Sequence, residues 1–223
     1  VLKPIYFSEP QPKYKTTKGS RVVVRKTGDS IFAAFTEDEE SYVIQNLYQV
    51  LDIKPPYSGR ALVGILNSKL LTFLYQNSPY GQFGRPMAQM RKSGLDKLPV
   101  PKTPDEKILE SIEARVTSIA EMEKELRQEL ENFAVLLKVE FGIELSQGKI
   151  DSIPTLGAEE AIGLLPKKTS VEQKHKFVNF FEKGAWSVRK KSAEVNSLKL
   201  AINQDVAALY DLSKGQTEIV NQL

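Results

Sequence analysis

The chain has 223 residues, of which 41% are hydrophobic and 26% are charged, a composition typical of a folded globular protein. It contains no cysteine and one histidine, His175. These counts exclude a disulfide framework, a thiolate metal site and a cysteine nucleophile, and they argue against a metal centre or catalytic triad built on histidine. The most apolar stretch, residues 61–75, is interrupted by polar residues and is too short to span a bilayer, so no membrane association is expected.

The net charge of +3 is unevenly distributed along the chain. Residues 1–102 contain 15 Lys and Arg against 8 Asp and Glu, whereas residues 103–223 contain 16 against 20. The first part also holds 12 of the 19 aromatic residues. A basic, aromatic half is typical of a module that contacts a polyanion. A difference in net charge of this size between two halves of a chain also arises by chance in proteins with two domains.

A β-hairpin is the first regular structure that the sequence predicts. Residues 21–25 form a β-branched run, residues 27–29 supply a turn with a glycine, and residues 30–35 return as a second strand. Residues 42–53 have the spacing of a third strand, which ends before a Pro-Pro pair. Together these segments predict an antiparallel meander.

Residues 61–102 combine a helix with a loop. Apolar residues recur at three- and four-residue intervals over residues 61–75, which predicts one helix with a broad buried face. Residues 77–86 contain two glycines and two prolines, which predict a loop. The basic pair Arg91-Lys92 follows, and the prolines of residues 98–101 then end any helix or central strand. A packed helix that presents a polar, basic loop is suited to contacting a partner.

The remaining residues predict two long helices. Residues 105–141 contain neither glycine nor proline, and their apolar residues follow a heptad-like spacing, so one helix should run up to Gly142. A second long helix is expected from about Ser170, and Gly184 lies inside it and weakens it enough to allow a break or bend there. Trp186 is expected to pack between the two helices.

The segment that joins these helices, at about residues 143–170, is expected to be an irregular connector with one short helix near residues 158–164. Two long amphipathic helices joined in this way favour an antiparallel, coiled-coil pair. The expected fold class is therefore α+β, with a small antiparallel or mixed sheet, a packed helix and a long loop in residues 1–102, and the helical pair in residues 103–223.

Two patterns resemble catalytic motifs but lack the required chemistry. Residues 54–57, Lys-Pro-Pro-Tyr, differ from the Asn/Asp-Pro-Pro-aromatic tetrad of amino-methyltransferases because Lys54 is only a hydrogen-bond donor where that tetrad needs an acceptor. Asp151 with residues 172–174, Glu-Gln-Lys, has the letters of a magnesium-dependent nuclease, but Glu172 falls at an expected helix start rather than on a strand. No catalytic residue, metal ligand or cofactor site is therefore expected in this fragment.

Basic, amide and aromatic side chains gather around the hairpin and the loop. Arginine can pair bidentately with guanine and glutamine with adenine, whereas lysine mainly contacts phosphate. Tyr80 and Phe83 either contact bases or pin the loop to the sheet, and each arginine taken singly also fits a solvated surface residue. The candidate DNA-contacting residues are Arg21, Arg25, Lys26, Arg60, Tyr80, Gln82, Phe83, Arg85, Gln89, Arg91 and Lys92.

Four segments resemble, in order and spacing, the TaqI-like C-terminal specificity domain of restriction–modification enzymes, which is akin to the recognition domains of type I specificity subunits. They are RVVVRKTGDSIFAAF, YVIQNLYQV, LVGILNSKLLTFLY and QMRKSGLDKLPVPK. The C-terminal INQDVAALYDLSKGQTEIVNQ is similar to the family's ending. Asn203, where the family has Asp, and residues 215–217, where it has acidic residues, depart from that pattern. The resemblance covers residues 20–102 and 175–222.

The resemblance implies a module that recognises double-stranded DNA for an adenine methyltransferase, with or without a nuclease, in a prokaryotic cytoplasm. The chain begins at Val1 without methionine, so we expect a C-terminal fragment, with S-adenosylmethionine and Mg²⁺ acting in upstream parts of the parent enzyme. The long helices would serve as a spacer, dock on a methyltransferase domain of the same or a partner chain, or self-associate.

Two other functions remain open at this point. One is a helical dimerisation or protein-interaction module without DNA affinity, held together by Ile112, Leu126 and Leu198 in a salt-insensitive oligomer. The other is an enzyme in its own right, which would need activity from this fragment with a methyl donor or magnesium; we expect none.

Overall fold

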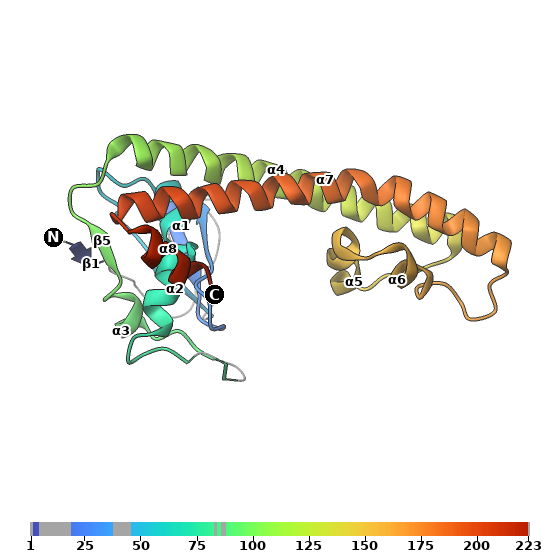
Figure 1. Cartoon of the computed structure of the whole chain (residues 1–223), viewed down its shortest axis with the longest axis horizontal. Helices are drawn as coiled ribbons and strands as arrows, with labels where there is room; N and C mark the ends of the chain where they lie inside the picture. The colour runs from blue at the N-terminus through green and yellow to red at the C-terminus, as the bar shows by residue number, and fades with distance from the viewer. Residues whose placement is uncertain (1, 5–18, 38–45, 83, 86–87, 223) are drawn as a thin grey trace. The chain divides into compact units, whose positions relative to one another are not determined.

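The computed structural model describes residues 2–4, 19–37, 46–82, 84–85 and 88–222 (Figure 1). These residues fall into two compact units, one made of residues 1–117 with 200–223 and the other of residues 118–199. Both long helices contribute residues to each unit. Within the described residues, no helix has the length and apolar character needed to cross a membrane.

The first unit contains a three-stranded antiparallel sheet. Strand β2 (Arg21–Arg25) lies in the centre, with β3 (Ala33–Thr36) on one side and β4 (Leu47–Val50) on the other. The β2–β3 hairpin is confirmed, with Val22 opposite Phe35. The predicted meander is wrong, because β4 pairs with β2 instead of β3. A central position suits the β-branched run of β2, where Val22 and Val24 are fully buried.

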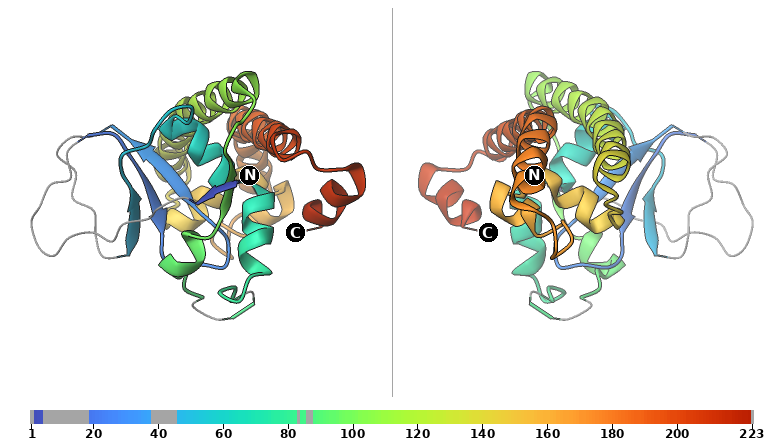
Figure 2. Two further views of the ribbon diagram at one scale, coloured as in Figure 1. Left: turned by 90° about the vertical axis from the view of Figure 1, so that its left-hand side faces the viewer. Right: turned by 90° about the vertical axis from the view of Figure 1, so that its right-hand side faces the viewer.

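Two helices replace the single helix predicted over residues 61–75. Helix α1 (Gly59–Leu66) covers β2 and β3, and α2 (Lys69–Gln76) follows after a break at Asn67 and Ser68 (Figure 2). The hydroxyl of Ser68 accepts a hydrogen bond from the backbone N–H of Leu71, and the amide of Asn67 bonds both backbone groups of Ala33. Asn and Ser side chains that bond to backbone in this way favour helix ends over helix interiors.

A second, two-stranded sheet pairs β1 (Leu2–Pro4) with β5 (Pro99–Pro101). Two tyrosine hydroxyls donate to the carbonyls of β5: Tyr57 to Pro101 at 2.6 Å and Tyr210 to Pro99 at 2.7 Å. Burial raises the pKa of Tyr57 to about 12 and also raises the pKa of Tyr210, so both remain neutral donors near neutral pH. These bonds fix the segment that leads from the loop into the first long helix.

The two long helices are α4 (Glu106–Phe141) and α7 (Val171–Leu209). Helix α4 ends as predicted at Gly142, which adopts a positive φ of 67°. The pairs along the helices run in opposite directions, from Phe141 with Phe177 to Glu125 with Lys191. The predicted antiparallel pairing is therefore confirmed.

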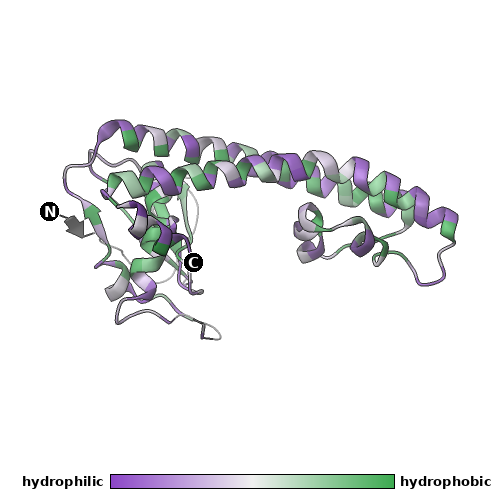
Figure 3. Ribbon diagram, viewed as in Figure 1, coloured by the Kyte–Doolittle hydropathy of each residue, from purple (hydrophilic) through white to green (hydrophobic). Residues whose placement is uncertain are grey.

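In the first unit, the end of α7 contacts both the start of α4 and the start of α2. The Asp205 carboxylate of α7 accepts hydrogen bonds from Arg115 and Ser111 of α4, each at 2.9 Å. Asn203 accepts a bond from the Lys69 backbone N–H at the start of α2. Helix α8 (Lys214–Asn221) also contacts α2. Most residues of α1 are hydrophobic, as the colouring in Figure 3 indicates, and Ala61–Leu66 are all buried.

The second unit has its own hydrophobic core, built around five phenylalanines of the two helices: Phe133, Phe141, Phe177, Phe180 and Phe181. The connector is more regular than predicted, with α5 (Gln147–Ser152), a 3₁₀ turn (Ile153–Thr155) and α6 (Ala158–Ile162). It contributes the fully buried Ile153 and Ala161 to this core. The connector thus folds onto the helical pair instead of merely joining its ends.

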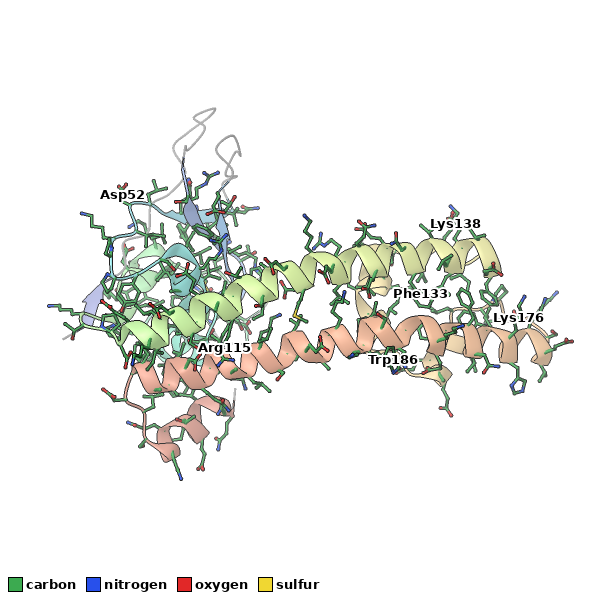
Figure 4. All side chains as sticks on the ribbon, turned by 90° about the horizontal axis from the view of Figure 1, so that it is seen from above. Asp52, Arg115, Phe133, Lys138, Lys176 and Trp186 are labelled. Atoms are coloured by element: carbon green, nitrogen blue, oxygen red, sulfur yellow. The ribbon has the colours of Figure 1, made fainter. Side chains whose placement is uncertain are left out.

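One prediction about α7, the packing of Trp186 between the helices, is wrong, and the break that Gly184 could allow does not occur. The helix passes through Gly184 without a break, because that glycine lies against Phe133; a Cβ there would be 2.1 Å from the ring. Trp186 does not pack between the helices. Its side chain is 65% exposed and lies on the side of α7 away from α4 (Figure 4), where Lys190 lies over the ring.

Candidate nucleic-acid interface

The loop after α2 and the turn of the β2–β3 hairpin are joined by backbone hydrogen bonds. The N–H of Gly28 donates to the carbonyl of Ala88 at 2.8 Å, and the N–H of Met90 donates to the carbonyl of Lys26 at 2.7 Å. Between these bonds, Thr27 and Gln89 form an antiparallel β-bridge. The hairpin and the loop, which are more than 50 positions apart in sequence, therefore form one surface.

Side chains on the loop side of this ladder alternate as they do along a β-strand. Ala88 and Met90 are buried at 5% and 2% exposure, whereas Gln89 between them is exposed. Its bridge partner Thr27 is exposed as well. The ladder thus presents a small polar face to solvent while its other face packs on the domain.

Several hydrogen bonds hold the loop in place. The Tyr48 hydroxyl donates to the carbonyl of Met90 at 3.1 Å, and the Arg91 N–H donates to the hydroxyl of Tyr75 at 2.7 Å. Arg91 is also the N-cap residue that immediately precedes helix α3 (Lys92–Leu95). Burial raises the pKa of Tyr75, which keeps its hydroxyl neutral. The backbone on the C-terminal side of the loop is therefore anchored to both the sheet and α2.

A groove of about 710 Å³ lies beside the ladder. Its lining combines amide, basic and hydroxyl side chains and contains four of the candidate residues: Gln82, Gln89, Arg91 and Lys92. The other lining residues are Tyr48, Met90, Ser93 and Asp96. Amide and basic groups around an open groove supply the donors and acceptors that contact base edges and phosphates.

The basic candidates near the groove differ in what they contact. Arg91 and Arg85 are exposed, and Arg25 is exposed with its guanidinium 5.4 Å from the ring centre of Phe32. Lys92 forms an ion pair with Asp96 at 2.6 Å. Lys26 lies over the Tyr48 ring at 4.5 Å. These five basic candidates therefore lie on the hairpin and on the segment around the loop that is bonded to it.

Two arginine candidates lie elsewhere. Arg21 is fully buried and donates from Nη1 to the carbonyl of Gly19 at 3.0 Å, so the expectation that it lies on the surface is wrong. Arg60 contacts the opposite end of the hairpin, where it pairs with Glu37 at 3.1 Å and lies over the Phe35 ring. Neither lines the groove.

The two aromatic candidates have different outcomes. Tyr80 packs on α3: its hydroxyl accepts from Lys97 at 2.7 Å, and a Cβ on Gly94 would be 2.7 Å from the Cβ of Tyr80. Pinning the loop, one of the two roles expected for Tyr80, is therefore what the contacts show, although α3 takes the place of the sheet. Phe83 lies outside the described residues.

Sequence reasoning missed Thr27, Tyr48 and Ser93. From the sequence alone, Thr27 fits a turn and Tyr48 fits a strand. The exposed position of Thr27 depends on the bridge to Gln89, which no local pattern encodes. A signal was available for Tyr48, because a tyrosine on a buried strand usually places its hydroxyl against a polar partner.

Among the described residues, no group of three or more His, Cys, Asp and Glu side chains is arranged to hold a metal ion. Residues 54–57 form the expected turn, with the Tyr57 N–H donating to the Lys54 carbonyl at 3.2 Å. Glu172 lies in the first turn of α7 and Asp151 in α5, with no strand at either position.

Comparison with known proteins agrees with this arrangement. Residues 3–100 match the family model described as the TaqI-like C-terminal specificity domain. Comparisons with curated proteins and with solved structures found no match. The matched span covers the three-stranded sheet, helices α1 to α3 and the loop, and it ends within β5. Residues 3–100, which are 98 of the 223 residues, are therefore similar to the TaqI-like C-terminal specificity domain.

Proposed function

We propose that residues 1–102 are the sequence-specific DNA target recognition domain of a restriction–modification enzyme. In this proposal the chain has no catalytic activity of its own, and it positions double-stranded DNA for an adenine methyltransferase, with or without a nuclease, in the upstream part of the same enzyme. S-adenosylmethionine, and Mg²⁺ where a nuclease is present, would bind in those upstream parts. The family match supports the DNA-recognition role.

The observation that carries the proposal is the ladder between the hairpin turn and the loop. It joins the hairpin that carries Arg25 and Lys26 to the loop that leads to Arg91 and Lys92, and a groove lined by two glutamines lies beside it. Basic side chains bind phosphate without regard to sequence, whereas amides at base edges discriminate between bases. Both kinds of group are needed for site-specific binding, and both occur here.

We propose that residues 103–223 act as a spacer and as the docking region for the methyltransferase domain. Contacts at the end of α7 support this role: Asp205 bonds to α4, Asn203 bonds to α2, and Tyr210, which follows α7, bonds to β5. In this proposal, these contacts hold the end of α7 in a fixed position against the recognition domain.

Replacement of both Arg85 and Arg91 by alanine tests the location of the interface. Each phosphate contact that is lost makes the slope of log affinity against log salt less steep by about 0.9, so the double variant should bind duplex DNA more weakly with a slope that is shallower by about two. The measurement is an electrophoretic mobility shift of the full chain, titrated in salt.

Arg60→Ala is the matched control, because Arg60 is another partly exposed arginine but lies outside the groove and is paired with Glu37. Its slope should equal that of the wild type. If the Arg85/Arg91 variant keeps both the affinity and the slope, the groove is not the DNA-contacting surface.

One observation favours the alternative of a helical association module. Val135 and Val139 of α4 are 60% and 73% exposed, one helical turn apart. Ile112, however, is fully buried against its own chain beside Gly64, so it is not available to hold an oligomer together. This alternative predicts a salt-insensitive oligomer without DNA affinity, which the same titration, combined with sedimentation, distinguishes.

A further inference from the structure

We propose that Thr27 and Gln89 form a two-residue unit that specifies an A·T base pair in the major groove of the target site. This inference rests on the proposed function and deepens it, because it names the residues that select a base and the base that they select. Thr27 is not among the DNA-contacting candidates that were predicted from the sequence.

The first argument is the geometry of the bridge. The two backbone bonds that flank it, Gly28 to Ala88 and Met90 to Lys26, make Thr27 and Gln89 an antiparallel pair of the type whose two residues share no backbone hydrogen bond with each other. Directly opposed residues of this type have Cβ atoms about 4.5–5.5 Å apart on the same face. Both residues are exposed, so their side chains project from the ladder next to each other.

The second argument is the shape and rigidity of the ladder. The major groove of B-DNA admits a two-stranded β-ribbon, and here the two strands of the ribbon are the hairpin turn and the loop. The buried Ala88 and Met90 on either side of Gln89 anchor it to the domain. The Met90 carbonyl is also held by Tyr48. A side chain on a backbone fixed in this way can discriminate between bases without first ordering the loop.

The third argument separates the two glutamines of the groove. The Oε1 of Gln82 accepts a hydrogen bond from the backbone N–H of Gln89 at 3.1 Å, so the Gln82 carboxamide already supports the ladder. No hydrogen bond involving the Gln89 carboxamide occurs among the described residues of the loop and its neighbours. Bidentate pairing with adenine needs the amide oxygen for N6–H and the amide nitrogen for N7, and Gln89 offers both.

Thr27 supplies the complementary chemistry for the same base pair. Its methyl group can contact the C5-methyl group of thymine, and its hydroxyl can donate to thymine O4. Arg91 and Lys92 line the same groove and are placed to contact the adjacent phosphates. The unit therefore has an acceptor, donors and an apolar methyl in the combination that an A·T pair presents.

The test is selection of bound sequences from a pool of random duplex DNA by the full chain. The wild type should recover a consensus that contains a fixed A·T pair, Gln89→Ala should lose selectivity at that position alone, and Gln89→Arg should change that position from A to G, since arginine pairs with guanine O6 and N7. The preference for A over the other bases should fall by about 5- to 150-fold in Gln89→Ala, which corresponds to the 1–3 kcal/mol that one bidentate pair contributes.

Gln128→Ala is the matched control: Gln128 is an exposed glutamine of α4 that does not line the groove, so the same A·T pair should be recovered. Thr27→Ser, which lacks the methyl group, should weaken selection of the T at that pair. An unchanged consensus in both Gln89 variants overturns the inference while leaving the proposed function intact. If the wild type recovers no consensus, the proposed function itself is wrong, and the inference fails with it. Gln89 is exposed, so its variants should fold, which circular dichroism checks.

Discussion

Phe181→Ala should lower the free energy of unfolding of the helical unit by about 3–5 kcal/mol, the usual cost of removing a large buried aromatic side chain. Phe181 is fully buried, and its ring centre lies 5.6 Å from that of Phe133 and 5.8 Å from that of Phe177. The variant would leave a cavity in a core that only residues 126–188 build. Denaturant unfolding followed by circular dichroism measures the change.

Trp186→Ala is the control for this prediction, because Trp186 is a larger aromatic residue on the same helix with 65% of its side chain exposed. Its replacement should change stability by no more than about 0.5 kcal/mol. A larger loss for Trp186 than for Phe181 would contradict the assignment of the core and restore the sequence-based expectation that the tryptophan packs between the helices.

Gly64→Ala should destabilise the first unit by about 1–3 kcal/mol, although alanine is the better helix former. A Cβ at this position would be 2.3 Å from Cγ2 of Ile112 and 3.1 Å from Cγ2 of Val116, so α1 could not stay as close to α4. Overpacking of this kind outweighs the gain of up to about 1 kcal/mol from helix propensity. Thermal unfolding of the full chain gives the sign directly.

Gly215→Ala provides the same substitution in the same unit without the steric conflict. Gly215 lies in α8, and a Cβ added there would have no neighbouring atom within 4 Å, so alanine should stabilise the protein by up to about 1 kcal/mol. If both substitutions stabilise, α1 and α4 do not approach each other closely at Gly64.

The elements whose signals are local were predictable from the sequence. The hairpin follows from a β-branched run, a turn with Gly28 and a second apolar run, and Gly28 does adopt a positive φ of 123°. Helix α4 follows from its uninterrupted apolar spacing and its glycine stop. Each signal lies within the segment that it specifies, so tertiary contacts did not need to be known.

The errors arose where distant contacts decide the outcome. The break between α1 and α2 depends on the bonds of Asn67 to Ala33 and of Lys69 to Asn203, partners up to 134 positions away. Trp186 lies five residues from Phe181, which on an α-helix is a rotation of about 140° away from the core. Residue size suggested burial for Trp186, but helical position decided against it.

The candidate site was predictable in place but not in detail. Arg91, Lys92, Gln82 and Gln89 line one groove, as expected from their proximity in sequence. The sequence did not reveal that Arg21 is buried or that Arg60 forms an ion pair with Glu37 away from the groove. The charge of a residue does not determine which face of a strand or helix it occupies. Thr27 was missed since its role depends on a bridge to a distant loop.

Hydrogen–deuterium exchange of the full chain, with and without mixed-sequence duplex DNA at low salt, tests the central claim most directly. DNA should slow the exchange of backbone amides in peptides covering residues 24–30 and 88–96, because the hairpin turn and the loop would be covered together. Peptides from the phenylalanine core of the second unit should be unchanged. DNA-dependent slowing that is absent from both of the first two peptides, or confined to α4 and α7, would contradict the proposal that this ladder and its groove recognise DNA.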